Sequence, residues 1–198
     1  VKIDGGIERT EENLRKLGID ALIAIGGEDT LGVATTLTEH GFHVIGVPKT
    51  IDNDLSGTDY TFGFDTAVSF ASECIDRLFS TATSHGRVIV VEVMGRYAGW
   101  IALNAGVACG AHAILIPEIP YELEPVAETI RHRELHGAKF SIVVVAEGAR
   151  RVGGSVSVVG KVVGQAERLG GVGEKVAAEL ERLTGKEART VVLGHLLR

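Results

Sequence analysis

Two turns of the sequence combine glycines, carboxylates and a lysine in a way that suits phosphoryl transfer. The first, Gly26–Thr30, follows an apolar run and precedes a helix-like stretch. Its glycines let backbone N–H groups approach an anion, Thr30 can cap the helix, and a helix N-terminus favours negative charge. Mg²⁺ commonly binds one or two carboxylates together with substrate phosphates, so Glu28 is the candidate metal ligand. The alternative is an ordinary turn in which Glu28 and Asp29 only complement the helix dipole.

The second turn, Gly46–Asp54, also follows an apolar run. Open α/β sheets bind ligands at the carboxyl ends of their strands, so this position favours a functional site. In a locally extended segment, Asp52 and Asp54 point to the same side. One carboxylate can then accept the proton of an attacking hydroxyl, while Lys49 stabilises charge on the transferring group. The alternative is a turn rich in Asp and Asn that binds nothing.

Basic side chains at the ends of later apolar runs indicate phosphate binding. Arg87 precedes one run and Arg96 follows it, and each guanidinium offers forked donors that match phosphate oxygens. Either arginine can equally be a solvated surface residue. The last runs carry further polar residues at their ends, namely Glu147, Arg189, His195 and Arg198. Basic groups after a strand favour a second phosphate site, with a structural imidazole as the alternative for the histidine.

The elements that position these residues alternate between β-branched apolar runs and amphipathic stretches of helical length. The runs predict strands at 21–25, 44–47, 88–93, 113–116, 141–146 and 190–193. The stretches predict helices at 7–17, 30–40, 65–84, 98–108, 123–136 and 172–184. Successive apolar residues, as in Val88–Val91, are typical of strands covered on both faces. The pattern predicts an α/β fold with doubly wound, mostly parallel sheets and helices on both faces.

Glycine is the outlier of the composition, with 26 of 198 residues. The segment Arg150–Gly173 is rich in glycine and has neither the helix nor the strand period. It is expected to be a mobile surface loop. The alternative, a glycine-rich phosphate cradle, lacks the strand-to-helix spacing that such cradles have.

Charge and composition exclude several classes of protein. The 20 Lys and Arg against 26 Asp and Glu give a net charge of −6, which leaves no polybasic surface for nucleic acid or anionic lipid. No apolar run approaches the roughly 20 residues of a membrane helix. Cys74 and Cys109 lie in apolar stretches, which favours buried thiols and a cytoplasmic location. Both chain ends interrupt predicted elements, which indicates an internal fragment.

These residues resemble the 6-phosphofructokinase family. The similarity is carried by the stretches Gly26–Thr30, Pro48–Asp54, Met94–Arg96 and Gly194–Arg198, and it covers essentially the whole chain in the same order. The resemblance implies a two-lobed α/β enzyme, truncated at both ends here, that uses Mg²⁺ to phosphorylate the 1-hydroxyl of fructose 6-phosphate in glycolysis. It implies a partial donor and Mg²⁺ lobe at 1–63 and an incomplete fructose 6-phosphate lobe at 64–198.

The resemblance also implies roles for individual residues. Glu28 matches the metal ligand and Asp52 the proton acceptor, with Asp29 and Lys49 beside the reacting phosphoryl group. The donor-binding residues are Gly26, Gly27, Asp29, Thr30 and Lys49. The substrate-binding residues are Thr50, Asp52, Asp54, Met94, Gly95, Arg96, Glu147, His195 and Arg198. Arg87 and Arg189 match arginines that reach the 6-phosphate from an adjacent subunit, which implies a homo-oligomer with shared sites.

The sequence departs from the family pattern at two places. It lacks the opening strand and the Gly-Gly-x-x-x-Gly-x-Asn phosphate loop of the family. Leu197 is apolar where the family carries a polar residue.

Asp29 favours pyrophosphate as the phosphoryl donor, because ATP-dependent members of the family usually carry glycine there. A carboxylate at the place of the ATP α-phosphate brings two anions together and disfavours ATP. An ATP-dependent enzyme is the alternative. The NAD kinase and diacylglycerol kinase superfamily has a similar glycine turn but no place for Thr50–Asp54 or Met94–Arg96. A noncatalytic regulatory subunit that binds sugar phosphate is a further alternative, which the retained Asp52 and Glu28 disfavour.

Overall fold

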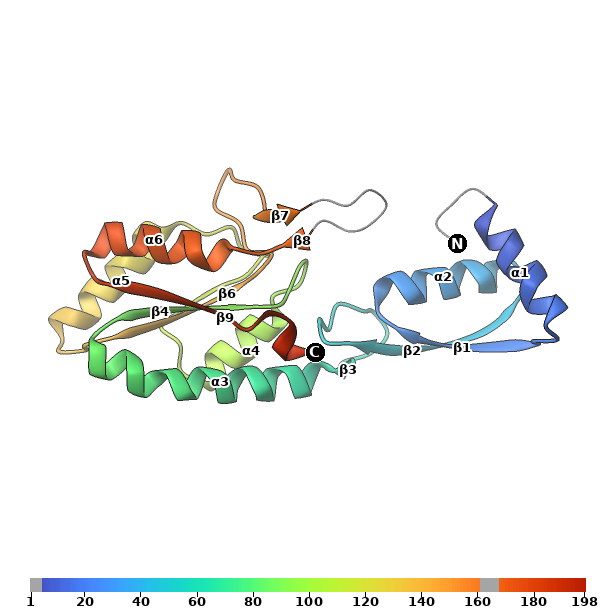
Figure 1. Ribbon diagram of the computed structural model, residues 1–198, viewed down its shortest axis with the longest axis horizontal. Helices are drawn as coiled ribbons and strands as arrows, with labels where there is room; N and C mark the ends of the chain where they lie inside the picture. Colours follow the sequence, from blue (N-terminus) through green and yellow to red (C-terminus); the bar gives the residue numbers. More distant parts are fainter. Residues whose placement is uncertain (1–4, 161–167) are drawn as a thin grey trace. The chain divides into compact units, whose positions relative to one another are not determined.

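The computed structural model describes residues 5–160 and 168–198. The chain divides into two compact units, residues 1–63 and 64–198. Each unit contains its own parallel sheet (Figure 1). What each unit binds stays a prediction.

The first unit is a three-stranded parallel sheet in the order β1-β2-β3. Its elements are α1 (Gly6–Lys16), β1 (Ala21–Gly26), α2 (Glu28–Glu39), β2 (His43–Thr50) and β3 (Phe62–Gly63). Helix α2 packs on β1 and β2, and its Leu31 lies 3.1 Å from where a Cβ at Gly46 would stand. Side chains alternate across a strand, so Ile45 beside Gly46 faces away from α2 and is 67% exposed. The described helices therefore cover one face of this sheet, and not both faces as expected.

The second unit has a four-stranded parallel sheet in the order β5-β6-β4-β9. In chain order, its helices and the strands of this sheet are α3 (Phe64–His85), β4 (Val88–Val93), α4 (Trp100–Ala108), β5 (Ala113–Leu115), α5 (Leu123–Leu135), β6 (Ser141–Ala146), α6 (Val172–Thr184), β9 (Ala188–Val192) and the 3₁₀ helix η1 (Gly194–Leu197). Helices α5 and α6 lie on one face of the sheet and α3 and α4 on the other (Figure 1). The predicted doubly wound α/β fold is thus confirmed.

The core of the second unit lies on both faces of β4 and β6, which are buried at every residue. On one face, Val88 and Val90 pack with Val176 and Leu180 of α6. On the other face, α4 approaches the sheet closely, because a Cβ at Gly106 would stand 2.7 Å from Ile114 of β5. Burial on both faces explains why these strands are apolar at successive residues.

The glycine-rich segment Arg150–Gly173 contains more regular structure than expected. The strands β7 (Val158–Gly160) and β8 (Arg168–Leu169) pair in antiparallel fashion, and α6 begins at Val172. The Nζ of Lys175 in α6 donates to the Oγ of Ser157 at 2.9 Å. Residues 161–167 of the segment lie outside the described residues. The short antiparallel pair is the difference from the expected loop, whereas α6 begins where the helix at 172–184 was predicted.

Both cysteines are free and partly buried. Desolvation by burial is the main cause that raises the pKa of each thiol, at Cys74 and at Cys109. The thiol of Cys109 also donates to the carbonyl of Ser72 at 3.3 Å. These features are those of inert, reduced thiols. Of the helices that the structure describes, none combines the length and the apolar character needed to cross a membrane.

Candidate active site

The carboxyl ends of β1 and β2 bring the two predicted turns of the first unit together. Gly26 at the end of β1 pairs with Pro48 of β2. A Cβ at Gly27 would stand 3.4 Å from the Cβ of Thr50. The donor-type turn and the Asp-rich turn are therefore neighbours on one edge of the sheet, where α/β sheets bind their ligands.

Helix α2 begins two residues earlier than predicted, which changes the role of Thr30. Gly27 is the N-cap and no side chain caps the helix, while Thr30 and Leu31 donate their N–H groups to the Gly27 carbonyl at 3.1 and 3.0 Å. A Cβ at Gly26 would stand 2.5 Å from the Oγ1 of Thr30. The expectation that Thr30 caps the helix is therefore wrong: Thr30 packs over Gly26. Glycine is acceptable as an N-cap, and acids favour the first turn, which explains the earlier start.

Asn53 shapes the loop that carries Asp52 and Asp54. Its φ of 54° is in the left-handed region, which asparagine tolerates better than most residues. Its Oδ1 accepts from the N–H of Thr61 at 2.8 Å, and its Nδ2 donates to the carbonyl of Asp59 at 3.2 Å. The segment is therefore not extended, and the argument that placed Asp52 and Asp54 on the same side is wrong.

Thr61 holds the same loop from its far end. Its Oγ1 donates to the carbonyl of Thr50 at 2.8 Å, and the residue is only 4% exposed. The N–H of Asp52 donates to the Oγ1 of Thr50 at 3.2 Å. Asp52 is half-buried, whereas Asp54 and Lys49 are exposed. Sequence reasoning missed the positioning roles of Asn53 and Thr61; an asparagine between two aspartates was a signal for the first only.

In the second unit, three adjacent strands end at one edge and bring six predicted residues together. The strands β4, β6 and β9 are parallel, with Val93 opposite Ala146 and Glu92 opposite Val192. The predicted residues that follow these strand ends are Met94, Gly95, Arg96, Glu147, His195 and Arg198. Met94 and Gly95 are buried, while Arg96 and Glu147 are half-buried. This edge therefore combines two arginines and a histidine with one carboxylate, and the forked donors of a guanidinium match phosphate oxygens.

The loops after β4 and β6 interlock through their backbones. The N–H of Glu147 donates to the Val93 carbonyl at 2.9 Å, and the N–H of Gly148 donates to the Gly95 carbonyl at 3.0 Å. A Cβ at Gly148 would stand 1.9 Å from the carbonyl oxygen of Arg96. Glycine at 148 is thus required for the path of the backbone that carries Arg96 and Glu147. Sequence reasoning missed this residue, because a glycine after a strand-end glutamate does not by itself indicate a close backbone contact.

The 3₁₀ helix η1 presents the two basic residues after β9. His195 and Arg198 are exposed, whereas Leu197 between them is only 4% exposed. The N–H of Leu193 donates to the carbonyl of Glu92 at 2.9 Å, which fixes the start of η1 on β4. The apolar residue at 197, a departure from the family pattern, therefore anchors η1 to the core.

Arg87 and Arg189 lie at the opposite, amino edge of the same sheet. Arg87 directly precedes β4, and Arg189 is the second residue of β9, where it pairs with Ile89. The six residues of β4 span roughly 20 Å at about 3.3 Å a residue. The two arginines therefore cannot bind the same phosphate group as His195 and Arg198 of their own chain.

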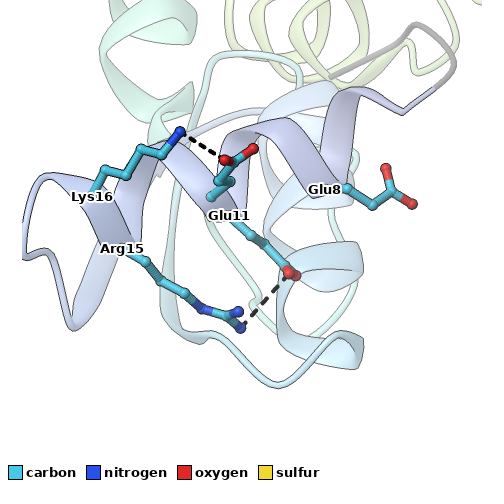
Figure 2. A pocket seen from close by; sticks show the side chains of 5 residues that line it. Glu8, Glu11, Arg15 and Lys16 are labelled. Atoms are coloured by element: carbon cyan, nitrogen blue, oxygen red, sulfur yellow. Dashed lines mark ion pairs between the residues drawn. The ribbon is translucent and has the colours of Figure 1, made fainter.

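A surface pocket of the first unit lies along α1 (Figure 2). It is lined by Glu8, Glu11, Glu12, Arg15 and Lys16. Arg15 pairs with Glu11 at 3.8 Å and Lys16 with Glu12 at 2.6 Å. None of the predicted site residues lines this pocket, so the candidate active site is defined by the strand ends and not by this hollow.

Glu28 stays the predicted ligand of a Mg²⁺ ion. Within residues 5–160 and 168–198, no group of three or more His, Cys, Asp or Glu side chains is arranged to hold a metal. Mg²⁺ needs no such cage, because it keeps several waters and binds one or two carboxylates together with substrate phosphates. Glu28 is exposed in the first turn of α2, beside the donor-type turn, and a single carboxylate there suits such an ion.

Known proteins match the chain over nearly all of its length. The family model described as phosphofructokinase matches residues 2–198. The ATP-dependent 6-phosphofructokinase of Chloroflexus aggregans is 57% identical over 190 residues, which are 96% of this chain and 52% of that protein. The pyrophosphate–fructose 6-phosphate 1-phosphotransferase of Amycolatopsis methanolica is 57% identical over 204 residues, which cover 100% of this chain and 58% of that protein. The chain thus spans about half the length of the curated relatives it matches.

A solved structure matches the fold in the same way. The pyrophosphate-dependent phosphofructokinase of Nitrosospira multiformis superposes with a TM-score of 0.82 at 26% identity. The match covers 100% of this chain and 50% of that one.

Proposed function

This chain belongs to the phosphofructokinase family, and we propose that the protein it comes from transfers a phosphoryl group to the 1-hydroxyl of fructose 6-phosphate. The products are fructose 1,6-bisphosphate and the dephosphorylated donor, and the reaction serves glycolysis. The observation that carries the proposal is the gathering of Arg96, Glu147, His195 and Arg198 at one sheet edge. A sugar with hydroxyls and one phosphate fits a carboxylate beside several cations.

In this proposal, Asp52 is the proton acceptor. The oxygen of the 1-hydroxyl attacks the transferring phosphorus, the bond from that phosphorus to the leaving phosphate breaks, and the hydroxyl proton moves to the Asp52 carboxylate. Lys49 stabilises negative charge on the transferring group. The loop held by Asn53 and Thr61 keeps Asp52 half-buried, which supports a fixed orientation for the base.

Glu28 would hold Mg²⁺ in this site. The ion, when bound, neutralises charge on the phosphate oxygens of the donor. Gly26 and Gly27 allow a phosphate to approach the backbone N–H groups at the start of α2, where the helix dipole favours an anion.

We propose pyrophosphate as the phosphoryl donor. Relatives with the same 57% identity are named as pyrophosphate-dependent and as ATP-dependent enzymes, so similarity alone singles out neither donor. The proposal depends on Asp29, which is exposed in the first turn of α2. A carboxylate there repels the extra phosphate of ATP next to the transferring pair, and pyrophosphate lacks that group.

Replacing Asp29 with Gly in the full-length protein is expected to shift the donor preference toward ATP. The wild type should turn over with pyrophosphate and not with ATP. The variant should raise kcat/KM for ATP relative to pyrophosphate by about tenfold or more, because the like-charge repulsion is gone. Steady-state assays with each donor at saturating fructose 6-phosphate measure the ratio.

Glu39→Gln is the matched control for this experiment. Glu39 is an exposed acid at the other end of α2, so its replacement removes the same charge away from the donor. The control should keep the wild-type ratio. Robust turnover of the wild type with ATP and none with pyrophosphate would refute the donor proposal and leave the phosphofructokinase activity standing.

The active species is expected to be a homo-oligomer. Arg87 and Arg189 lie at the amino edge of their sheet, roughly 20 Å from the residues at its carboxyl edge, which supports a role for them in the site of another copy. Sedimentation velocity on the full-length protein, run at the concentration of the activity assay, should show a dimer or a tetramer. An active monomer would contradict the shared site.

A further inference from the structure

Glu187 joins the two arginines at the amino edge of the second unit. Its Oε2 accepts from the Nε of Arg87, and its Oε1 accepts from a terminal nitrogen of Arg189. The two arginines are 102 residues apart in the chain (189 − 87), and the adjacent strands β4 and β9 bring them together. One carboxylate therefore links two guanidiniums that the fold places side by side.

The hydrogen bonds to Glu187 do not use all the N–H groups of the two arginines, so some of these groups can bind a further anion. A guanidinium carries five N–H groups. Glu187 takes only the Nε of Arg87, so the ion pair does not use either terminal nitrogen of that residue. One terminal nitrogen of Arg189 donates to Glu187 and the other donates to the carbonyl of Ala188. The Nε of Arg189 takes part in neither bond. A phosphate can bind these donors without displacing the carboxylate.

The charges around Glu187 keep it ionised. The hydrogen bond from Arg87 is the main cause that holds the pKa of Glu187 below its ordinary value, and the charges of Arg189 and His85 act in the same direction. Lys186, the next residue, is turned to other partners, because its Nζ lies 2.9 Å from Glu134 and 3.2 Å from the Lys139 carbonyl. The carboxylate thus serves the two arginines.

We propose that Glu187 is a positioning residue that holds Arg87 and Arg189 as one phosphate-binding pair for the sugar phosphate bound by a second copy of the chain. The inference rests on the proposed function. Without the carboxylate, two like-charged side chains on neighbouring strands repel each other and adopt many rotamers. Binding a phosphate would then have to order both of them, and affinity for the sugar phosphate would fall.

Glu187→Gln in the full-length protein tests the proposal. Glutamine has nearly the same shape, but its NH₂ group cannot accept from the second arginine, so one of the two links is lost. KM for fructose 6-phosphate should rise by about 5- to 30-fold with kcat within about twofold, since the arginines act in binding and not in the chemical step. Calorimetric titration with fructose 6-phosphate should show the same loss of affinity. Glu187→Asp keeps the charge and should recover part of the loss.

Glu179→Gln is the matched control, because it breaks another carboxylate–arginine pair, with Arg182 on α6. The control should keep the wild-type KM, and both variants should keep the wild-type melting temperature. A Glu187→Gln enzyme with an unchanged KM overturns the proposal, and a lower KM overturns it as well, because the carboxylate would then compete with phosphate. A wild type that is inactive with both donors refutes the proposed function instead.

Discussion

Replacing Asp52 with Asn in the full-length protein is expected to lower kcat by about 10²–10⁴-fold, with a smaller change in affinity for fructose 6-phosphate. Asparagine keeps the shape of aspartate but cannot take up the hydroxyl proton. The backbone N–H of residue 52 donates to the Oγ1 of Thr50 at 3.2 Å, and the substitution does not alter these atoms. Steady-state kinetics and sugar phosphate binding measured on the same preparation separate the chemical step from binding.

Asp59→Asn is the control for this variant. Asp59 is exposed in the same loop. Its backbone carbonyl accepts a hydrogen bond from Asn53, and the substitution keeps this bond because it changes only the side chain. Its kcat should stay close to that of the wild type. An Asp52→Asn enzyme with wild-type kcat would remove Asp52 from the mechanism.

Replacing Gly148 with Ala is expected to lower kcat/KM for fructose 6-phosphate by about 100-fold. The added Cβ would stand 1.9 Å from the carbonyl oxygen of Arg96 and 2.9 Å from that of Gly95. Neither backbone atom can rotate away as a flexible side chain could, so the loops after β4 and β6 must separate. A displacement of about 1 Å in a substrate-positioning group can lower the rate by about 10²-fold.

Gly32→Ala provides the comparison, because no atom lies within 4 Å of the added Cβ on α2. Alanine is favoured over glycine in helices by about 0.8–1 kcal/mol, so this variant should melt at the same temperature as the wild type or higher, with unchanged activity. Circular dichroism establishes that both variants are folded before their kinetics are compared. Wild-type kcat/KM in the Gly148→Ala enzyme would show that the interlocked loops do not position the substrate.

The two central strands of the second unit, β4 and β6, could be predicted closely from the sequence because both of their faces are buried. β4 and β6 have the predicted bounds, 88–93 and 141–146, since burial on both faces makes nearly all of their residues apolar, with Glu92 and Ser141 as the polar exceptions. β2 was predicted as 44–47 but runs from His43 to Thr50. Lys49 and Thr50 are polar and look like turn residues, yet they pair with Phe62 and Gly63 of β3, more than ten residues away. A pattern of neighbouring residues cannot predict a strand end that depends on pairing with a segment more than ten residues away.

Some residues of the candidate site could likewise be predicted from the sequence, and others could not. Residues at strand ends, such as Arg96 and Glu147, could be singled out because the end of an apolar run is visible in the sequence. Gly148 could not be singled out. A side chain at this position would collide with the carbonyl oxygen of Arg96, which is 52 residues earlier in the chain (148 − 96). Glu187 contacts Arg87 across 100 residues, and neither residue type nor spacing marks such a pair. Which residues these contacts join depends on the order of strands in the folded sheet.

A residue of β4, outside the segment that precedes the helix, holds the beginning of α6. Glu92 is only 3% exposed, and its two carboxylate oxygens accept from the N–H groups of Gly171 and Gly173 at 3.3 and 2.7 Å. A negative charge at this position also complements the helix dipole. Evolution can therefore lengthen, shorten or rewrite the glycine-rich stretch ahead of Gly171 while the register of α6 on the sheet stays the same. Variation among relatives should accordingly be tolerated in that stretch and resisted at Glu92.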